Sequence, residues 1–333
     1  MNKETRKPSI GISFDGFAPF HEALDFAKQA TAAGAASLWM ADHLGYRESI
    51  VSCLAFAMAT EKVRVVPTAV SPYLRHPMPT AMQMATLTEA APGRAALAVG
   101  AGNPLFLAES GEAMEKPVRA IREFVEALRA LWSGEPVTME AMRFRLKGAR
   151  MMFKPPSSIP IYLCPMREQM LRLAGKIADG AVLSAAISTT TVRKSLETIA
   201  AGAAEAGRDA RAVHTSCFIS FIAAEDKRKA VDTVRQKLAF MFRNKFLDEN
   251  IALTGVPLDQ QAIIAAMSKR DYEGAAKLIS DEAVDAFAVA GTVQECCDKL
   301  QRFADTGLHE LVLLMAGGID DQRFGLRVLK EFS

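Results

Sequence analysis

Short apolar segments alternate with longer amphipathic segments along the whole chain. Eight short segments have the composition of strands and lie at 10–14, 37–40, 63–70, 95–99, 159–163, 181–184, 213–223 and 310–315. The segments between them have helical spacing; within 116–132, Val118, Ile121, Val125, Leu128 and Trp132 recur every three or four residues and share one face. Strands that alternate with helices are typical of parallel β/α units, and eight such units predict a (β/α)8 barrel.

Two segments interrupt this alternation. Residues 134–158, before the fifth strand, are rich in Met, Arg, Lys and Pro, and residues 243–285 add helical pieces before the last strand. We expect both to be insertions that lie over the barrel mouth as lids. Because no repeat, low-complexity tract or linker is evident, residues 1–333 are predicted to form a single domain.

Composition narrows the class of function. The chain has 40 Lys and Arg against 38 Asp and Glu, so it lacks the basic surplus typical of nucleic-acid binding. No apolar segment resembles a signal peptide or is long enough to span a bilayer, which predicts a cytoplasmic protein without membrane contact. The five cysteines show no C-x-x-C spacing, so neither a disulfide framework nor a zinc site is predicted. A small-molecule substrate is expected.

Candidate chemistry follows the strands, because barrel active sites lie at the carboxyl ends of the strands. In "LWMADHLGYRES", Asp42 and His43 come directly after the second predicted strand. The strand ends supply one histidine and no carboxylate cluster, so neither a hydrolytic metal site nor a glycosidase carboxylate pair is predicted. Small residues, Met and aromatic residues predominate instead, which suits a flat and largely apolar cofactor.

Each of these features also has a plainer interpretation. A lone Asp-His pair at a strand end is as often a satisfied polar pair as a catalytic one. In the segment Gly100-Ala101-Gly102, a dinucleotide motif is excluded because Leu105 occupies the place of its third glycine, so a tight turn beside a ligand is favoured. The run Thr189-Thr190-Thr191 is either an ordinary helix start or a phosphate site.

Five segments, in their order along the chain, resemble the luciferase-like flavin-dependent oxidoreductases. They read "ADHLGYRES", "VVPTAVSPYLRHPMPTAMQMATLTEAAPGRAALAVGAGN", "EKPVRAIREFVEALRALWSGEPVT", "IPIYLCPMREQMLRLAGKIADGAVLSA" and "GTVQECCDKLQRFADTGLHELVLL". The resemblance covers nearly the whole chain. Within the superfamily, the chain is most similar to the methylenetetrahydromethanopterin reductase branch, which uses the deazaflavin coenzyme F-420.

This resemblance implies roles for particular residues. In the deazaflavin enzymes a bulge with a non-proline cis peptide follows the third strand and cups the central cofactor ring, and the loop after the sixth strand meets the cofactor phosphate. The implied cofactor-binding residues are Thr68, Ala69, Val70, Ser71, Gly102, Asn103, Ser184, Ala185, Ser188 and Thr190. His43 is implied as the acid/base and Asp42 as the residue that orients it. Asn103 stands where the sugar-phosphate dehydrogenases of this branch carry glutamate, so their sugar substrate is not expected.

The resemblance therefore predicts hydride transfer between coenzyme F-420 and a small organic substrate. One alternative is a monooxygenase that uses reduced FMN supplied by a separate flavin reductase. A second alternative is a barrel that binds flavin without turnover. Family members are often dimers, so a homodimer is also expected.

Overall fold

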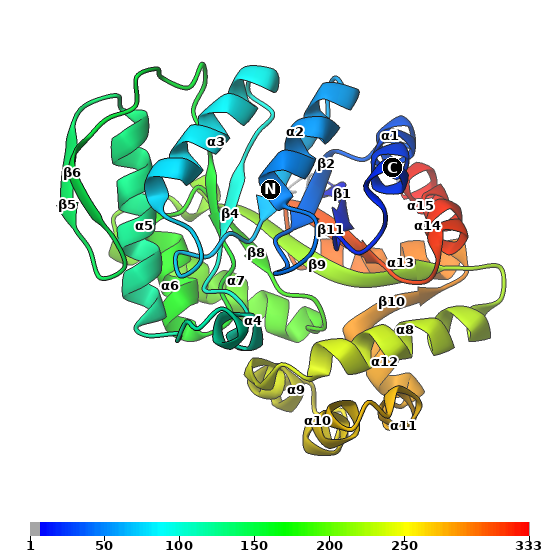
Figure 1. The fold of residues 1–333 in the computed structure, drawn as a ribbon. Coiled ribbons are helices and arrows are strands. Elements are labelled where there is room, and N and C mark those ends of the chain that lie inside the picture. Colours follow the sequence, from blue (N-terminus) through cyan, green and yellow to red (C-terminus); the bar gives the residue numbers. More distant parts are fainter. Residues whose placement is uncertain (1–6, 333) are drawn as a thin grey trace, which may run out of the picture.

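The eight predicted strands form a parallel β-barrel, which confirms the predicted fold class (Figure 1). The structure is a computed structural model that describes residues 7–332. The barrel strands are β1 (Ser9–Phe14), β2 (Ser37–Ala41), β3 (Arg64–Thr68), β4 (Leu97–Val99), β7 (Ile161–Leu163), β8 (Gly180–Leu183), β9 (His214–Ala223) and β11 (Glu310–Met315). Their order around the sheet is β3-β2-β1-β11-β9-β8-β7-β4. The assignment of residues 1–333 to one domain stays a prediction.

The barrel closes between β3 and β4. Two isolated pairs, Val65 with Ala95 and Val70 with Val99, connect these strands in place of a continuous ladder. Pro67 lies between the two pairs and has no N–H to donate. Strand β3 is also shorter than the predicted 63–70, because its regular pairing with β2 ends at Thr68.

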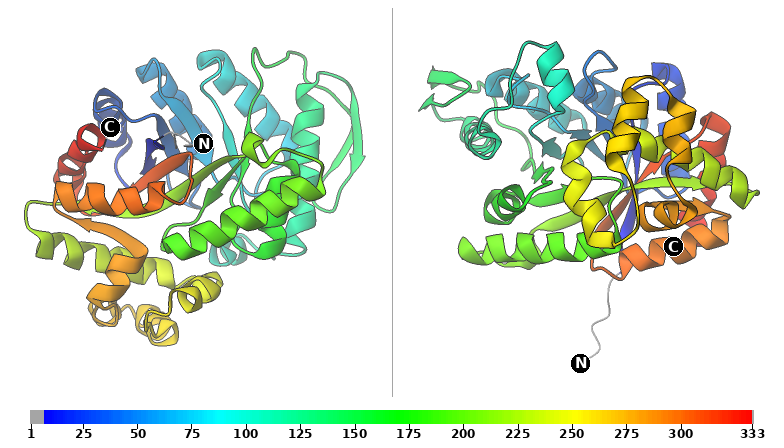
Figure 2. Two further views of the ribbon diagram at one scale, coloured as in Figure 1. Left: turned by 180° about the vertical axis from the view of Figure 1, so that it is seen from behind. Right: turned by 90° about the horizontal axis from the view of Figure 1, so that it is seen from below.

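Helices cover the outside of the barrel (Figures 1 and 2). Those that follow barrel strands are α1 (Phe20–Ala32), α2 (Ser49–Ala59), α3 (Pro77–Ala90), α4 (Pro104–Glu109), α5 (Pro117–Trp132), α6 (Glu168–Ile177), α7 (Thr189–Glu205), α8 (Lys227–Phe242), α14 (Ile319–Gly325) and α15 (Arg327–Glu331). Helix α13 (Val293–Ala304) begins with a capping box between Thr292 and Glu295, as their spacing suggests. Seen from behind, α7 and α13 lie in front of the strands (Figure 2).

The barrel interior is a packed core. Five strands contribute Trp39, Val66, Tyr162, Val182 and Val312 to one buried cluster, which also contains Ala96 and Ala98 at β4. Such filling is typical of eight-stranded barrels. The chemistry is therefore confined to the space beyond the strand ends.

A buried carboxylate lies at the start of β11. Glu310 is 0% exposed, and its carboxylate accepts hydrogen bonds from Arg64 at 2.6 Å, from Ser216 at 3.1 Å and from Ser37. His214 lies 3.3 Å from it. Burial alone would raise the pKa of Glu310, but the hydrogen bond to His214, the charge of Arg64 and the Ser37 hydroxyl outweigh burial and hold that pKa below its ordinary value.

The two insertions differ in place and in structure. Residues 134–158 form an antiparallel hairpin of β5 (Val137–Glu140) and β6 (Arg145–Ala149) beside α5. Residues 243–285 contain the short 3₁₀ segment η2 (Lys245–Leu247), α9 (Asp248–Thr254), α10 (Gln260–Ser268), α11 (Tyr272–Lys277) and most of α12 (Asp281–Phe287). Figure 1 shows α9, α10 and α11 gathered below α8, far from the hairpin.

The strands β5, β6 and β10 (Ala288–Gly291), which lie outside the barrel ring, were not predicted. Strand β10 pairs in parallel with Ser220 to Ala223, the part of β9 that extends beyond its pairing with β8. The sequence of β10 is AVAG, and the strand follows α12 without an intervening turn. Four small apolar residues after a helix carry no period of their own, so the pattern could not distinguish β10 from a helix end.

Candidate active site

A large cavity opens at the carboxyl ends of the barrel strands. Its volume is about 1020 Å³, and its walls come from the residues that follow seven of the eight strands and from α8. Of the predicted site residues, it is lined by Asp42, His43, Thr68, Ala69, Gly102, Asn103, Ser184 and Ala185. The structure thus brings together most of the predicted site, within a volume large enough for a cofactor and a substrate.

One wall of the cavity is built from small residues. The Thr68–Ala69 peptide bond is cis, at the position implied by the family resemblance. Gly100 lies against this bulge, because a Cβ atom built on Gly100 would be 3.0 Å from the Cβ atom of Ala69 and 3.4 Å from that of Cys164. Gly102 has a φ of +94°, which favours glycine. The wall is therefore smooth and close-packed, as a flat ring requires.

Two residues expected to touch the cofactor lie behind this wall. Val70 is buried; its N–H donates to the carbonyl oxygen of Ala98, and its own carbonyl accepts from the N–H of Gly100. The Ser71 hydroxyl donates to the carbonyl oxygen of Ala101 at 2.9 Å. Neither residue lines the cavity, so the predicted direct contact with the cofactor is not seen. Val70 and Ser71 support the bulge from behind instead.

Cys164 lines the same wall from the end of β7. Burial raises the pKa of its thiol to about 12. Because the thiolate is the nucleophilic form of cysteine, Cys164 contributes packing to the wall and no nucleophile near neutral pH.

His43 is fixed by the backbone. Its Nδ1 atom lies 2.9 Å from the carbonyl oxygen of Asp15, and since a carbonyl can only accept, Nδ1 carries the proton. The imidazole stacks on Phe17 with 5.4 Å between ring centroids and meets the edge of Phe106 at 6.0 Å. Nε2 is thereby the nitrogen left for exchange with a ligand, and the residue lines the cavity.

Asp42 does not make the expected contact with His43. Its two carboxylate oxygens accept hydrogen bonds from Arg75 at 3.0 and 2.7 Å, and Ser49 donates to one of them at 2.9 Å. Arg75 also pairs with Glu48 at 2.6 Å. A bidentate guanidinium is a stronger partner for a carboxylate than a neutral imidazole, so Arg75 outcompetes His43. Asp42 joins the turn after β2 to the turn after β3.

The predicted phosphate loop is divided between two cavities. Ser184 and Ala185 line the large cavity, whereas Ser188 and Thr190 line a separate one of about 210 Å³. The Ser188 hydroxyl oxygen accepts from the N–H of Thr191 and caps α7, so the run of threonines contains an ordinary helix start. In the same way, the Asn103 side chain accepts from the N–H of Leu105 and caps α4.

Helix α8 supplies cavity residues that sequence reasoning missed. Thr233, Gln236, Lys237, Phe240 and Met241 line the cavity and recur at intervals of three and four. That spacing marks one helix face, but the chain alone does not say which face turns toward the mouth. Of these five side chains only Phe240 and Met241 are strongly apolar. In the sequence, packing of the helix against the barrel would explain them as well as a cavity would.

The second insertion reaches the cavity and the first does not. Asn244, Phe246 and Glu249 line it, while no residue of 134–158 does. Arg167, after β7, pairs with Asp248 at 2.7 Å and with Glu249. The start of the 243–285 insertion is thus tied to the loop after β7.

Residues 7–332 contain neither a metal centre nor a membrane-spanning helix. No group of three or more His, Cys, Asp or Glu side chains in this range is arranged to hold a metal ion. No helix in this range combines the length and apolarity that crossing a membrane requires.

Sequence comparison gives the family. Residues 4–310 match the luciferase-like monooxygenases. The chain belongs to this family. It is 30% identical to 5,10-methylenetetrahydromethanopterin reductase of Archaeoglobus fulgidus over 307 residues, which cover 91% of this chain and 92% of that protein. It is 28% identical to the F-420-dependent glucose-6-phosphate dehydrogenase of Microbacterium testaceum over 332 residues, 96% and 94% of the two chains. The family resemblance predicted from five segments is confirmed.

Solved structures of the luciferase-like fold agree with the barrel. The coenzyme F-420-dependent tetrahydromethanopterin reductase of Methanopyrus kandleri superposes with a TM-score of 0.88 at 24% identity, covering 98% of this chain and 100% of that one. An F-420-dependent secondary alcohol dehydrogenase in complex with an F-420–acetone adduct gives a TM-score of 0.80, also at 24% identity, with 98% of each chain covered.

Proposed function

We propose that this protein is an oxidoreductase that transfers a hydride between coenzyme F-420 and a small organic substrate. The observation that carries the proposal is the wall of small residues, Ala69 and Gly102, on a cavity that also contains His43. The relatives named as F-420-dependent enzymes support the choice of cofactor.

The residues present fit a flat redox ring. Ala69 and Gly102 leave the wall without bulky side chains, and Gly100 allows the bulge to lie against β4 and β7. Ser184 and Ala185 offer polar and backbone groups at the other end of the cavity wall. In this proposal these residues hold the coenzyme, which supplies the hydride when bound.

His43 handles the proton in this proposal. The Asp15 carbonyl holds Nδ1–H, so Nε2 is the nitrogen that exchanges a proton with the substrate. In the imidazolium form Nε2–H gives its proton to the substrate atom that becomes electron-rich, and in the neutral form Nε2 takes one in the reverse direction. Phe17 and Phe106 pack on the imidazole and keep it in one orientation. Asp42 takes no part in the proton transfer; its pairing with Arg75 holds the turns after β2 and β3 together.

Cofactor titration tests the proposal. Purified protein is titrated with oxidised F-420 and, separately, with FMN, and binding is followed by the absorbance and fluorescence of each cofactor. We expect saturable binding of F-420 and at least tenfold weaker binding of FMN. Tight binding of FMN without binding of F-420 would instead favour the flavin monooxygenase. Binding of either cofactor without turnover of any substrate would favour the non-catalytic barrel. The expected homodimer and reductase partner stay predictions.

A further inference from the structure

Lys237 is a cation on the wall of the main cavity. It lies on the cavity face of α8, and its Nζ atom donates a hydrogen bond to the carbonyl oxygen of Met315 at 2.8 Å. An ammonium group has three N–H donors. Within residues 7–332 this carbonyl is the one hydrogen-bond acceptor recorded for it, and no carboxylate of that range lies within 4 Å.

The other basic side chains of α8 contrast with Lys237. Lys227 pairs with Glu295, Lys229 pairs with Asp321 at 2.6 Å, and Arg228 and Arg235 both pair with Asp232 and Asp281. All of these pairs lie away from the cavity. The helix therefore satisfies its outer cations with carboxylates and leaves its inner cation without one.

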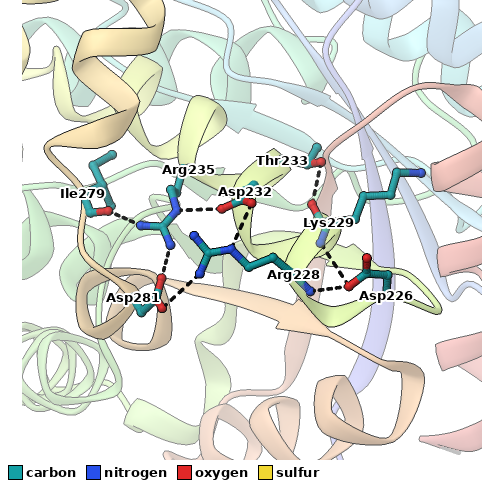
Figure 3. A network of polar contacts seen from close by, with 8 residues as sticks. All are labelled: Asp226, Arg228, Lys229, Asp232, Thr233, Arg235, Ile279 and Asp281. Atoms are coloured by element: carbon teal, nitrogen blue, oxygen red, sulfur yellow. Dashed lines mark hydrogen bonds and ion pairs between the residues drawn. The ribbon is translucent and has the colours of Figure 1, made fainter.

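The position of Lys237 is fixed by its helix. Arg235, two residues earlier, donates to the carbonyl oxygen of Ile279 and pairs with Asp232 and Asp281 (Figure 3). Figure 3 shows Arg228 in the same network, which ties α8 to the start of α12. Because several ion pairs hold the outer face of α8, Lys237 on its inner face has a defined position at the cavity.

The ammonium group is poorly compensated where it lies. Burial lowers the pKa of Lys237, and the negative charge of Asp15 only partly opposes this effect. A desolvated cation is costly unless an anion or several hydrogen bonds compensate it. The other cation on the cavity wall, Arg167, is already neutralised by Asp248 and Glu249. Lys237 is thus the cation that an incoming anion would meet.

The order of the strands places Lys237 across the mouth from the smooth wall. Met315 ends β11, and β11 lies four positions from β4 around the eight-stranded ring. Gly102 follows β4, so the glycine turn and the lysine approach the cavity from opposite sides. A ring bound on the smooth wall leaves the substrate on the side of Lys237, Asp15 and His43.

We propose that Lys237 binds a carboxylate group of the substrate and so selects anionic organic substrates. This inference rests on the proposed function, since it assigns the smooth wall to the cofactor. The carboxylate would occupy the remaining N–H donors of the ammonium group, and the reacting atom of the substrate would lie between the cofactor and His43. Lys237 is in this role a specificity-determining residue.

A matched pair of small ligands tests the proposal. Benzoate and benzamide have nearly the same shape and differ in charge, and their binding to the F-420-loaded protein is measured by calorimetry. We expect benzoate to bind at least about tenfold more tightly than benzamide, as is typical of a charge-assisted hydrogen bond. Lys237→Met should abolish this preference by weakening benzoate alone, and Lys237→Arg should retain most of it.

Controls separate this inference from simpler explanations. Lys229→Met makes the same change on the same helix, at an ion pair outside the cavity, and should leave the preference intact. Equal affinity for the two ligands in the unmodified protein, or a preference that survives Lys237→Met, would overturn the assignment. A tenfold or larger loss of F-420 affinity in Lys237→Met would also overturn it, because the lysine would then serve an anionic group of the coenzyme.

The same experiment distinguishes failure of the proposed function. If the unmodified protein binds no F-420, the proposed function fails at that step. The benzoate and benzamide comparison is then repeated on the cofactor-free protein. There, a benzoate preference that is lost in Lys237→Met supports the lysine as an anion-binding residue, and its absence overturns that role.

Discussion

The Nδ1 atom of His43 and the backbone carbonyl oxygen of Asp15 lie 2.9 Å apart, so the tautomer of the imidazole is set by the main chain. Side-chain carboxylates often perform this task in other enzymes, but here the Asp42 carboxylate is held by Arg75. A backbone partner cannot titrate. The orientation of His43 is therefore independent of pH as long as the turn after β1 keeps its shape.

Removal of the imidazole should affect turnover and not binding. In the F-420-loaded enzyme, His43→Ala is expected to lower kcat by roughly 10²–10⁴, because positioned proton transfer is lost. The affinity for F-420 should change by less than about threefold. His21→Ala, on the exposed surface of α1, is the matched control. Unchanged kcat in His43→Ala would refute its role as acid/base.

Substitution of the neighbouring aspartate should act on stability. Asp42→Asn removes the charge that Arg75 contacts through two nitrogen atoms, and both side chains are largely buried, with 15% and 18% of their surfaces exposed. We expect the free energy of unfolding in urea to fall by about 1–3 kcal/mol. The pH dependence of kcat should keep its shape, since His43 does not depend on Asp42. A shifted pH profile would instead show that Asp42 acts through the imidazole.

A single added methyl group should impair the smooth wall. Gly100→Ala would place its Cβ atom 3.0 Å from that of Ala69, so the bulge must shift by a few tenths of an ångström. We expect F-420 affinity to fall tenfold or more, while the melting temperature changes by only a few degrees. Gly318→Ala is the control, because that position near the mouth has an ordinary φ and open space. Equal effects of the two substitutions would contradict this account.

The buried carboxylate below the core should give a pH-dependent stability. Glu310→Gln leaves the partly buried Arg64 without its counter-charge, and we expect a loss of about 2–3 kcal/mol at pH 7. Because the pKa of Glu310 is lowered on folding, its ionised form stabilises the protein fully above the unfolded value of about 4.3, and this contribution is lost as the pH falls further. Urea unfolding of both proteins from pH 7 to pH 3.5 should therefore show a constant difference that narrows below about pH 4. A difference that grows toward acid would contradict the sign of the shift.

The barrel could be predicted because its signals are local. Each strand is an apolar run and each helix repeats its own period, so neither depends on distant residues. β10 had no such signal. The lining of the cavity was predictable where residues lie at strand ends, as at His43 and Thr68, and not where a contact depends on partners far along the chain. Asp42 and Arg75 are 33 positions apart, so the sequence does not show their bidentate contact. Packing decides which face of α8 turns toward the cavity and brings Lys237 to its wall.

Between β3 and β4, beside the smooth wall, isolated pairs replace a continuous hydrogen-bonded ladder, so the barrel is held together less firmly there. The N–H groups of Val70 and Gly100 donate hydrogen bonds between the ends of β3 and β4, next to the Thr68–Ala69 bulge. Local opening there breaks few hydrogen bonds, so these two amides should exchange with deuterium sooner than those inside the continuous ladders. A cofactor ring bound on the bulge would hold β3 and β4 together and oppose this opening. Slower exchange at the two amides would then report occupancy of the site in the complete absence of a substrate.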